Sequence, residues 1–297
     1  MNARRFVLAV ALATAFVGCD ESSDEEDVVE NVPLPGRPEE AAPAIAEIPG
    51  VSLDGLGASD RRLALRLLNE ILSPCGEPVS LARCVSERST CGDCLVAARY
   101  VARLAAEGLA DHEIRALVQG RFDPAAKVEI ETGDAPVRGA TMGAPVQLIV
   151  FSDFECPFCR QTHPLLQRAL REHDGQVQLV FKNYPLSMHE RALPAAIAAY
   201  AAHKQGKFWE MHDMLFEHQE ALTDADLEGY ARELGLDLDR FRADVADEAS
   251  AAAVEADKTL GRSLEVQGTP TLFVNGRRFE EPFENLSRYI AEELERR

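Results

Sequence analysis

The stretch FSDFECPFC at residues 151–159 places two thiols three residues apart, where a strand is expected to run into a helix. The apolar run 146–151 predicts a largely buried strand, because it is rich in β-branched and other apolar residues. Residues 160–173 carry apolar side chains at helical spacing, so Cys156 is expected at or just before a helix N-terminus. Unpaired N–H groups and the helix dipole stabilise an anion there, and Pro157 suits the first helical position.

The spacing of Cys156 and Cys159 predicts a redox-active pair that exchanges between dithiol and disulfide. Residues three apart share one helix face, close enough for a disulfide. A helix N-terminus in a C-x-x-C setting lowers a cysteine pKa from about 8.5 to roughly 3.5–7.5, and the thiolate is the nucleophile. Cys156 is therefore the expected attacking thiol and Cys159 the resolving thiol. The alternatives are a structural disulfide or half of a zinc site, and the preceding strand and Pro157 argue against zinc.

Three further motifs carry a family resemblance: FKNYPL at 181–186 followed by His189, QGKFWEMH at 205–212, and VQGTPTLFVNG at 266–276. With the cysteine pair, they make residues from about 126 to 297 resemble the bacterial DsbA-type thiol:disulfide oxidoreductases. The resemblance implies an α/β, thioredoxin-like fold with a helical insertion at about 186–264. It also implies that Pro270 is cis and faces the cysteines, with the backbone of Thr269 binding the substrate peptide. No cofactor is expected beyond the redox-active disulfide Cys156–Cys159.

Two departures from the family leave the direction of electron flow open. Val150 stands where relatives carry a buried acid that accepts a proton from the second cysteine. Asp153 or Glu155 could transfer this proton instead, or both could be solvated loop acids. Phe158 stands where the strongest oxidants have histidine, which predicts weaker thiolate stabilisation and a less oxidising couple. Thr269 points the same way by resemblance, so an isomerase or reductase that feeds electrons to another envelope protein is an alternative.

The first 18 residues predict an export signal, because two arginines precede an apolar stretch too short to span a bilayer. FVGC at residues 16–19 resembles the lipobox of bacterial lipoproteins, in which Cys19 becomes the lipidated N-terminus. The alternative is cleavage after Ala15, which would leave Cys19 as a free thiol. Seven cysteines make three pairs plus one, and lipidation accounts for the odd cysteine. These features predict a protein of the cell envelope, anchored by lipid on the periplasmic side of a membrane.

Residues 19–55 are expected to form a disordered acidic tether. Between residues 20 and 50, ten acids and five prolines accompany a single base, Arg37, so the segment cannot bury enough apolar surface to fold. The tether supplies about nine of the nineteen net negative charges of the 297-residue chain. Basic residues are not clustered, which argues against nucleic-acid binding.

A small all-α module with four cysteines is expected at residues 56–124, between the tether and the thioredoxin-like part at 125–297. A module of this size has a small core and is only marginally stable. Two disulfides among Cys75, Cys84, Cys91 and Cys94 are therefore expected in an exported protein. Three pairings are possible, and the sequence does not choose. Cys91-Gly92-Asp93-Cys94 also suggests a second redox pair that relays electrons to or from Cys156, and a four-cysteine zinc site is a further alternative.

The apolar patch in the insertion, residues 208–216, predicts a core stripe, or alternatively a rim around Cys156 that receives unfolded chains. Four histidines are expected in packing or at the surface rather than as metal ligands: His163, His189, His212 and His218. The chain is thus predicted to be a monomeric thiol:disulfide oxidoreductase acting on exported cysteine-containing proteins, with a membrane redox partner. The alternative from another class is a non-catalytic thiol metallochaperone or adaptor, in which the helical module serves for docking.

Overall fold

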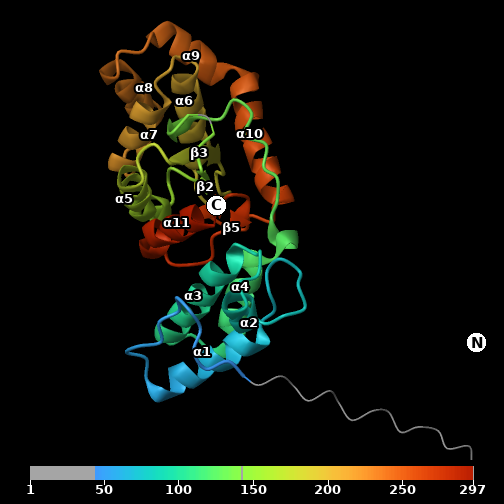
Figure 1. The fold of residues 1–297 in the computed structure, drawn as a ribbon. Coiled ribbons are helices and arrows are strands. Elements are labelled where there is room, and N and C mark those ends of the chain that lie inside the picture. Colours follow the sequence, from blue (N-terminus) through green and yellow to red (C-terminus); the bar gives the residue numbers. More distant parts are fainter. Residues whose placement is uncertain (1–43, 142, 297) are drawn as a thin grey trace, which may run out of the picture. The chain divides into compact units, whose positions relative to one another are not determined.

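The computed structural model describes residues 44–141 and 143–296 (Figure 1). The predicted export signal, Cys19 and most of the acidic tether lie outside these residues. Among the described residues, no helix is both long enough and apolar enough to cross a membrane.

Four helices form the cysteine-containing module: α1 (Ala58–Glu70), α2 (Leu81–Ser86), α3 (Asp93–Ala106) and α4 (Asp111–Phe122). Buried leucines of α1 pack against α3, which is buried along most of its length because its alanines and valines permit close approach. The segment before α1 belongs to the same core, since Ile48 and Leu53 are buried in it and the Asn69 amide hydrogen-bonds both backbone groups of Ile45. The packed region therefore begins before residue 56, whereas the sequence predicted a tether as far as residue 55.

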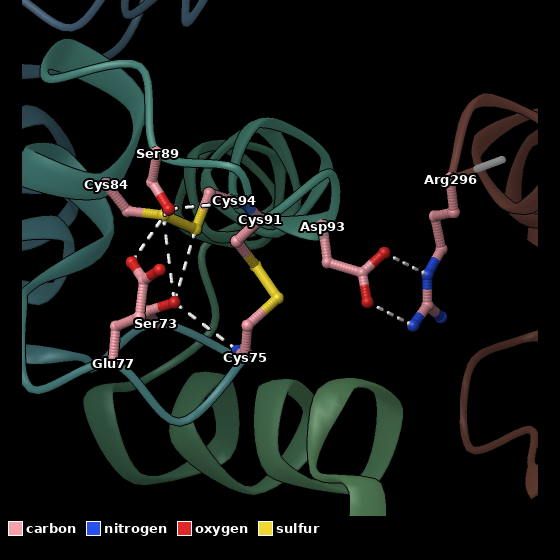
Figure 2. The surroundings of a disulfide bond; sticks show 9 residues. All are labelled: Ser73, Cys75, Glu77, Cys84, Ser89, Cys91, Asp93, Cys94 and Arg296. Carbon is pink, nitrogen blue, oxygen red and sulfur yellow. Dashed lines mark hydrogen bonds and ion pairs between the residues drawn. A yellow bond between two sulfur atoms is a disulfide. The ribbon is translucent and has the colours of Figure 1, made fainter.

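Two disulfides link the module, Cys75–Cys91 and Cys84–Cys94 (Figure 2). The expected two disulfides are therefore present, and their pairing is one of the three that the sequence left open. Cys91 and Cys94 are not bonded to each other in this structure, and each pairs with a cysteine outside the Cys91-Gly92-Asp93-Cys94 motif. All four sulfurs are engaged in these bonds, so the module as described is neither a four-thiolate zinc site nor a C-x-x-C disulfide.

A mixed five-stranded sheet forms the centre of the remaining chain, in the order β1-β3-β2-β4-β5. Its strands are β1 (Val137–Gly139), β2 (Val146–Ser152), β3 (Val177–Asn183), β4 (Thr271–Val274) and β5 (Arg277–Arg278). β2 runs parallel to β3 and antiparallel to β4, so the end of β2 leads into the cysteine loop beside the start of β4. All but one of the side chains of β2 and of β3 are buried, because helices cover both faces of the sheet.

Helices on the two faces hold the site in place. The helical insertion between β3 and β4 comprises α6 (Ala192–His203), α7 (Phe208–Glu217), α8 (Asp224–Glu233), α9 (Leu238–Ala246) and α10 (Glu248–Ser263). One face of β2 packs in a core with α5 (Pro157–Glu172), α6, α7 and α11 (Leu286–Glu295), and the other face packs near the end of α10 (Figure 1). Phe208, Met211, Leu215 and Phe216 are buried in the first core, so the core interpretation of this patch is correct. Short 3-10 turns lie at Pro124–Ala126 and Phe283–Asn285.

A buried ion-pair network joins the module to α11. The Arg121 guanidinium, only 2 % exposed, pairs with Glu292 and Glu293 and lies 3.6 Å from the centroid of the Tyr289 ring. Arg103 pairs with Glu281 through two hydrogen bonds of 2.9 and 3.1 Å. Such pairs offset the desolvation of their charges only while all partners are present.

Candidate active site

Cys156 caps the N-terminus of α5, with Pro157 at the first helical position. Cys159 follows within the first turn, and this arrangement is the one that the strand–C-P-F-C–helix pattern predicted. Both cysteines are free thiols and are buried, with exposed fractions of 3 % and 2 %. The Thr269–Pro270 peptide bond is cis, and the Cys156 thiol donates a hydrogen bond to the Thr269 carbonyl oxygen at 3.4 Å.

The environment of Cys156 stabilises its thiolate and lowers the pKa to about 5. The largest contribution is a hydrogen bond donated by the Cys159 thiol, which outweighs the opposing effect of burial. Thr269 and the backbone N–H groups of Phe158 and Cys159 add to the stabilisation. The sequence predicted a moderate lowering from the helix terminus, and the geometry adds this second thiol and these donors.

Cys159 has the opposite character, because burial raises its pKa far above the ordinary value for a thiol. The thiol of Cys156 also raises it, while the side chain of Ser152 and the backbone of Asp153 act in the other direction. A small cavity of about 10 Å³ next to Cys159 is lined by Ser152, His163 and His212. The protonated form of Cys159 is therefore favoured, and Ser152, His163 and His212 lie beside it among apolar side chains such as Val150 and Leu166.

The two acids proposed for proton transfer are held by backbone groups of the 184–191 loop. Asp153, 1 % exposed, accepts hydrogen bonds from the N–H groups of Glu155 and Leu186, each at 2.8 Å, and contacts His189 Nδ1 at 2.7 Å. Glu155 accepts from the N–H of Arg191 at 2.6 Å. Neither carboxylate has a hydrogen bond to Cys159 among the described residues.

His189 couples this loop to the nucleophile. Partial burial lowers its pKa, but the hydrogen bond and charge of Asp153 and the charge of Cys156 outweigh this and raise the pKa overall. A histidine outside the C-x-x-C motif thus interacts electrostatically with Cys156, and this interaction favours the protonated imidazole. His189 follows the FKNYPL motif by three residues. No sequence pattern, however, indicates that it pairs with Asp153.

Gln219 is a positioning residue that the sequence did not suggest. Its buried amide donates to the carbonyl oxygens of Phe154 at 2.8 Å and of Cys156 at 2.9 Å, which fixes the loop that leads into α5. Gln219 follows α7 in a connecting loop without a recognisable motif. Only the folded arrangement brings it to residues more than sixty positions earlier in the chain.

Two large apolar side chains beside the site are exposed: Phe158 at 63 % and Met188 at 79 %. Phe158 separates the two cysteines, and Met188 precedes His189. The exposed apolar surface near Cys156 is therefore formed by these residues, whereas most of the predicted rim at 208–216 is buried.

Three of the four histidines lie in packing contacts. His163 and His212 have ring centroids 4.9 Å apart, and His218 stacks on Tyr230. Burial lowers the pKa of His212 to about 4, so the ring stays neutral. One nitrogen each of His163 and His212 and one carboxylate oxygen of Asp213 lie within 4.8 Å of one another, but this carboxylate already pairs with Arg138 at 2.7 Å.

Comparison with known proteins places these features in a family. A family model described as "Thioredoxin" matches residues 131–292. The oxidised BdbD of Bacillus subtilis, a crystal structure, superposes with a TM-score of 0.52 and 24 % identity, over 57 % of this chain and 97 % of BdbD.

Curated relatives match over a shorter stretch. A Na(+)/H(+) antiporter NhaA 3 of Salinispora tropica is 46 % identical over 141 residues, which make up 47 % of this chain and 22 % of the antiporter. A Na(+)/H(+) antiporter NhaA 1 of Salinispora arenicola is 47 % identical over 136 residues, 46 % of this chain and 21 % of that protein. The matched stretches thus span about a fifth of the length of these relatives.

The matched family model covers more than half of the chain, including both cysteines, the cis proline and the intervening helices. The expected thioredoxin-like fold with inserted helices, preceded by a cysteine-containing helical module, is confirmed. The chain belongs to the thioredoxin family, and its fold resembles that of BdbD.

Proposed function

We propose that this protein is a thiol:disulfide oxidoreductase that acts on protein cysteines through the Cys156/Cys159 couple. One observation carries the proposal: two buried thiols share a helix N-terminus, with the pKa of Cys156 lowered to about 5 and that of Cys159 raised. The two thiols of a structural disulfide do not need different pKa values. Thiol–disulfide exchange does, because the thiol with the lower pKa supplies the thiolate that reacts.

In the oxidised form, a client thiolate attacks Cys156 Sγ, the Cys156–Cys159 bond breaks, and Cys159 leaves and takes up a proton. A second client thiolate then attacks the client sulfur of the mixed disulfide, and Cys156 leaves as a thiolate. Two electrons have moved from the client to the pair, and the client holds a new disulfide. Because a thiol of low pKa leaves fast, the low pKa of Cys156 accelerates this release. The Thr269 backbone beside Cys156 is the proposed contact for the client peptide.

The proposed direction of electron flow is oxidation of clients. Stabilisation of the Cys156 thiolate stabilises the reduced form, which makes the couple more oxidising. Phe158 and Thr269 favour the reverse direction by resemblance, so reduction or isomerisation by attack of Cys156 on a client disulfide is the second candidate. In that direction Cys159 resolves the mixed disulfide after losing its proton.

The proposed location is the cell envelope, with clients among exported proteins, a membrane protein as redox partner and a monomeric enzyme. This part of the proposal rests on the sequence of residues 1–19, which lie outside the described residues. Transport is not proposed, because the chain corresponds to only about a fifth of the antiporters.

Replacing Cys19 with alanine is expected to release the protein from membranes or to block its maturation. Membrane association that persists in a mature Cys19→Ala protein would rule out the lipid anchor.

The proposed chemistry is tested by oxidative refolding of a reduced, unfolded model protein together with trapping of clients. Cys156→Ser should abolish turnover, whereas Cys159→Ser should accumulate clients as mixed disulfides through Cys156, because resolution is lost. Refolding in the presence and absence of glutathione disulfide then separates oxidation from isomerisation. Trapping by Cys156→Ser rather than by Cys159→Ser would overturn the assignment of nucleophile and resolving thiol.

A further inference from the structure

The two disulfides of the helical module differ sharply in accessibility. Cys84 and Cys94 are each 2 % exposed, so an external thiol does not reach their bond. Cys75 is an exposed residue, although its partner Cys91 is buried. The Cys75–Cys91 disulfide is thus the one of the two that has an exposed residue.

A cavity of about 620 Å³ lies against this exposed end. Cys75 lines it together with mostly apolar neighbours, including Leu72, Val118 and Phe122. Leu72 is 62 % exposed and adds an apolar side chain to the lining of this cavity. An apolar side chain next to a cysteine in a partner would fill the cavity while its thiol meets Cys75.

Cys91 is a good leaving group for such an attack. It immediately precedes Gly92, the N-cap of the fourteen-residue helix α3, so the helix dipole stabilises the thiolate that leaves. The carboxylate of Asp93 in the first turn would oppose this charge, but Arg296 neutralises it with two hydrogen bonds of 2.9 and 2.8 Å (Figure 2).

The second disulfide lies next to the leaving sulfur. Cys91 Sγ is within 4.8 Å of the sulfurs of both Cys84 and Cys94. Ser73 Oγ lies 3.5 Å from Cys94 Sγ and 3.7 Å from Cys84 Sγ, as Figure 2 shows. Because disulfide sulfurs carry no hydrogen, the Ser73 hydroxyl is the donor, and it can stabilise negative charge on whichever sulfur leaves.

We infer that the module is a second thiol:disulfide exchange site, at which a cysteine-containing peptide with an apolar residue beside its cysteine docks in the cavity and attacks Cys75. The bond between Cys75 and Cys91 breaks, a mixed disulfide forms on Cys75, and Cys91 leaves as a thiolate. A second partner thiolate attacks the partner sulfur and releases Cys75, so two electrons pass from the partner to the module.

The Cys91 thiolate then attacks Cys94 Sγ, the Cys91–Cys94 bond forms, and Cys84 leaves and takes up a proton. This internal exchange conserves electrons and converts the resting pairing into the C-x-x-C disulfide. The site is independent of Cys156, so it can exist whether or not the proposed function at Cys156 is correct.

The test uses the full chain with Cys156→Ser and Cys159→Ser, equilibrated with increasing dithiothreitol and quenched with N-ethylmaleimide. Peptide mass spectrometry reads the state of each module cysteine. Cys75 should become alkylated at an about tenfold lower dithiothreitol concentration than Cys94, because an exposed disulfide is the more easily reduced. At intermediate concentrations, Cys94 should still be disulfide-bonded, to Cys84 or to Cys91. Alkylation of Cys75 and Cys94 in a single step would overturn the proposal.

Docking is tested with two ten-residue peptides whose single cysteine is flanked by leucines or by serines. The leucine peptide should form a mixed disulfide with Cys75 about tenfold faster, since burial of a leucine side chain in the cavity stabilises the bound peptide. Leu72→Ser should remove this difference and leave the rate with glutathione unchanged. Equal rates for the two peptides with the unaltered module would exclude the cavity as a docking site.

Two further variants separate failure of this inference from failure of the main proposal. Cys84→Ala with Cys94→Ala leaves Cys75–Cys91 as the single module disulfide and should retain its reduction by dithiothreitol. Cys75→Ala with Cys91→Ala should keep the Cys156-dependent refolding activity. Circular dichroism establishes that each variant is folded before its reactivity is compared. A folded Cys84→Ala, Cys94→Ala protein whose Cys75–Cys91 bond resists dithiothreitol would contradict the inference.

Discussion

His189 Nδ1 lies 2.7 Å from a carboxylate oxygen of Asp153, a fully buried side chain that immediately follows β2. The sequence suggested Asp153 as an acid that accepts a proton from Cys159. In the structure its charge is matched by an imidazole and two backbone N–H groups, so it holds the 184–191 loop against the cysteine loop. The acid therefore acts on the nucleophile through His189.

Replacing His189 with alanine is expected to raise the pKa of Cys156 by about 1, because the imidazole that interacts with Cys156 is lost and the Asp153 carboxylate keeps only its two backbone donors. The pH dependence of alkylation by iodoacetamide measures this pKa. His203→Ala is the matched control, since His203 faces Asp134 away from the cysteines and should leave the pKa unchanged. An unchanged Cys156 pKa in His189→Ala would show that His189 has no electrostatic effect on the site.

Gln219→Leu should lower turnover and destabilise the protein by about 1–3 kcal/mol, because the buried carbonyl of Phe154 loses its side-chain donor and that of Cys156 keeps only the N–H of Arg160. Turnover in the refolding assay and urea denaturation measure the two effects. Gln205→Leu is the matched control, because Gln205 also makes two hydrogen bonds to backbone, with Asp237, but at an exposed position. Equal effects of the two substitutions would argue against a role for Gln219 in positioning Cys156.

The reduced protein is expected to gain stability, relative to Cys156→Ser, as the pH rises from about 5 to about 8.5. The pKa of Cys156 is lowered to about 5 in the folded state, so folding favours the thiolate. This contribution is fully present above the pKa of the unfolded thiol and disappears as the pH falls through the folded value. Urea denaturation of both proteins across this range provides the measurement. The oxidised protein should show no corresponding trend, and a flat difference for the reduced pair would contradict the low pKa.

Phe158→His should make the Cys156/Cys159 couple more oxidising, because a histidine between the cysteines adds a donor and charge near the thiolate. We expect the unaltered couple to lie between about −270 mV, typical of thioredoxin, and about −120 mV, typical of the strongest oxidants. A glutathione titration with mass-spectrometric detection of these two cysteines measures both potentials. Phe158→Leu, which keeps an apolar side chain, should leave the potential close to the original value. A potential already at the oxidising limit and insensitive to histidine would refute this expectation.

Arg121→Ala should destabilise the protein by about 1.5–3 kcal/mol, because the buried carboxylate of Glu293 loses one of its two arginine partners and keeps the other, Arg296, at 2.9 Å. The exposed pair between Arg99 and Glu295 provides a comparison, and Arg99→Ala should cost at most about 1 kcal/mol. Urea denaturation gives both values. If the two substitutions cost the same, the Arg121 network does not stabilise the packing of the module on α11.

The sequence predicted those features that depend on neighbours in the chain. The strand and helix α5 follow from the local periodicity of apolar residues, and the start of the helix follows from the position of Pro157. Together with the C-P-F-C loop between them, these elements were enough to predict the thioredoxin-like fold. The disulfide pairing did not follow, because Cys75, Cys84, Cys91 and Cys94 are close enough in sequence for every connectivity. Packing of Ile48 and Leu53 was missed because prolines and acids surround them, a composition typical of tethers. Gln219 and the Asp153–His189 pair depend on contacts across the fold, which no short motif records.

The distance along the chain between Arg121 and Glu293 has a consequence for biosynthesis. The helical module leaves the ribosome before α11, because 172 residues separate Arg121 from Glu293. Until then the Arg121 guanidinium has no carboxylates from α11, and the surface that receives this helix stays open to solvent. The four module cysteines all precede this helix in the chain, so both disulfides can form before α11 docks. Docking of α11, rather than formation of the module itself, is therefore the event that completes the Arg121 ion-pair network.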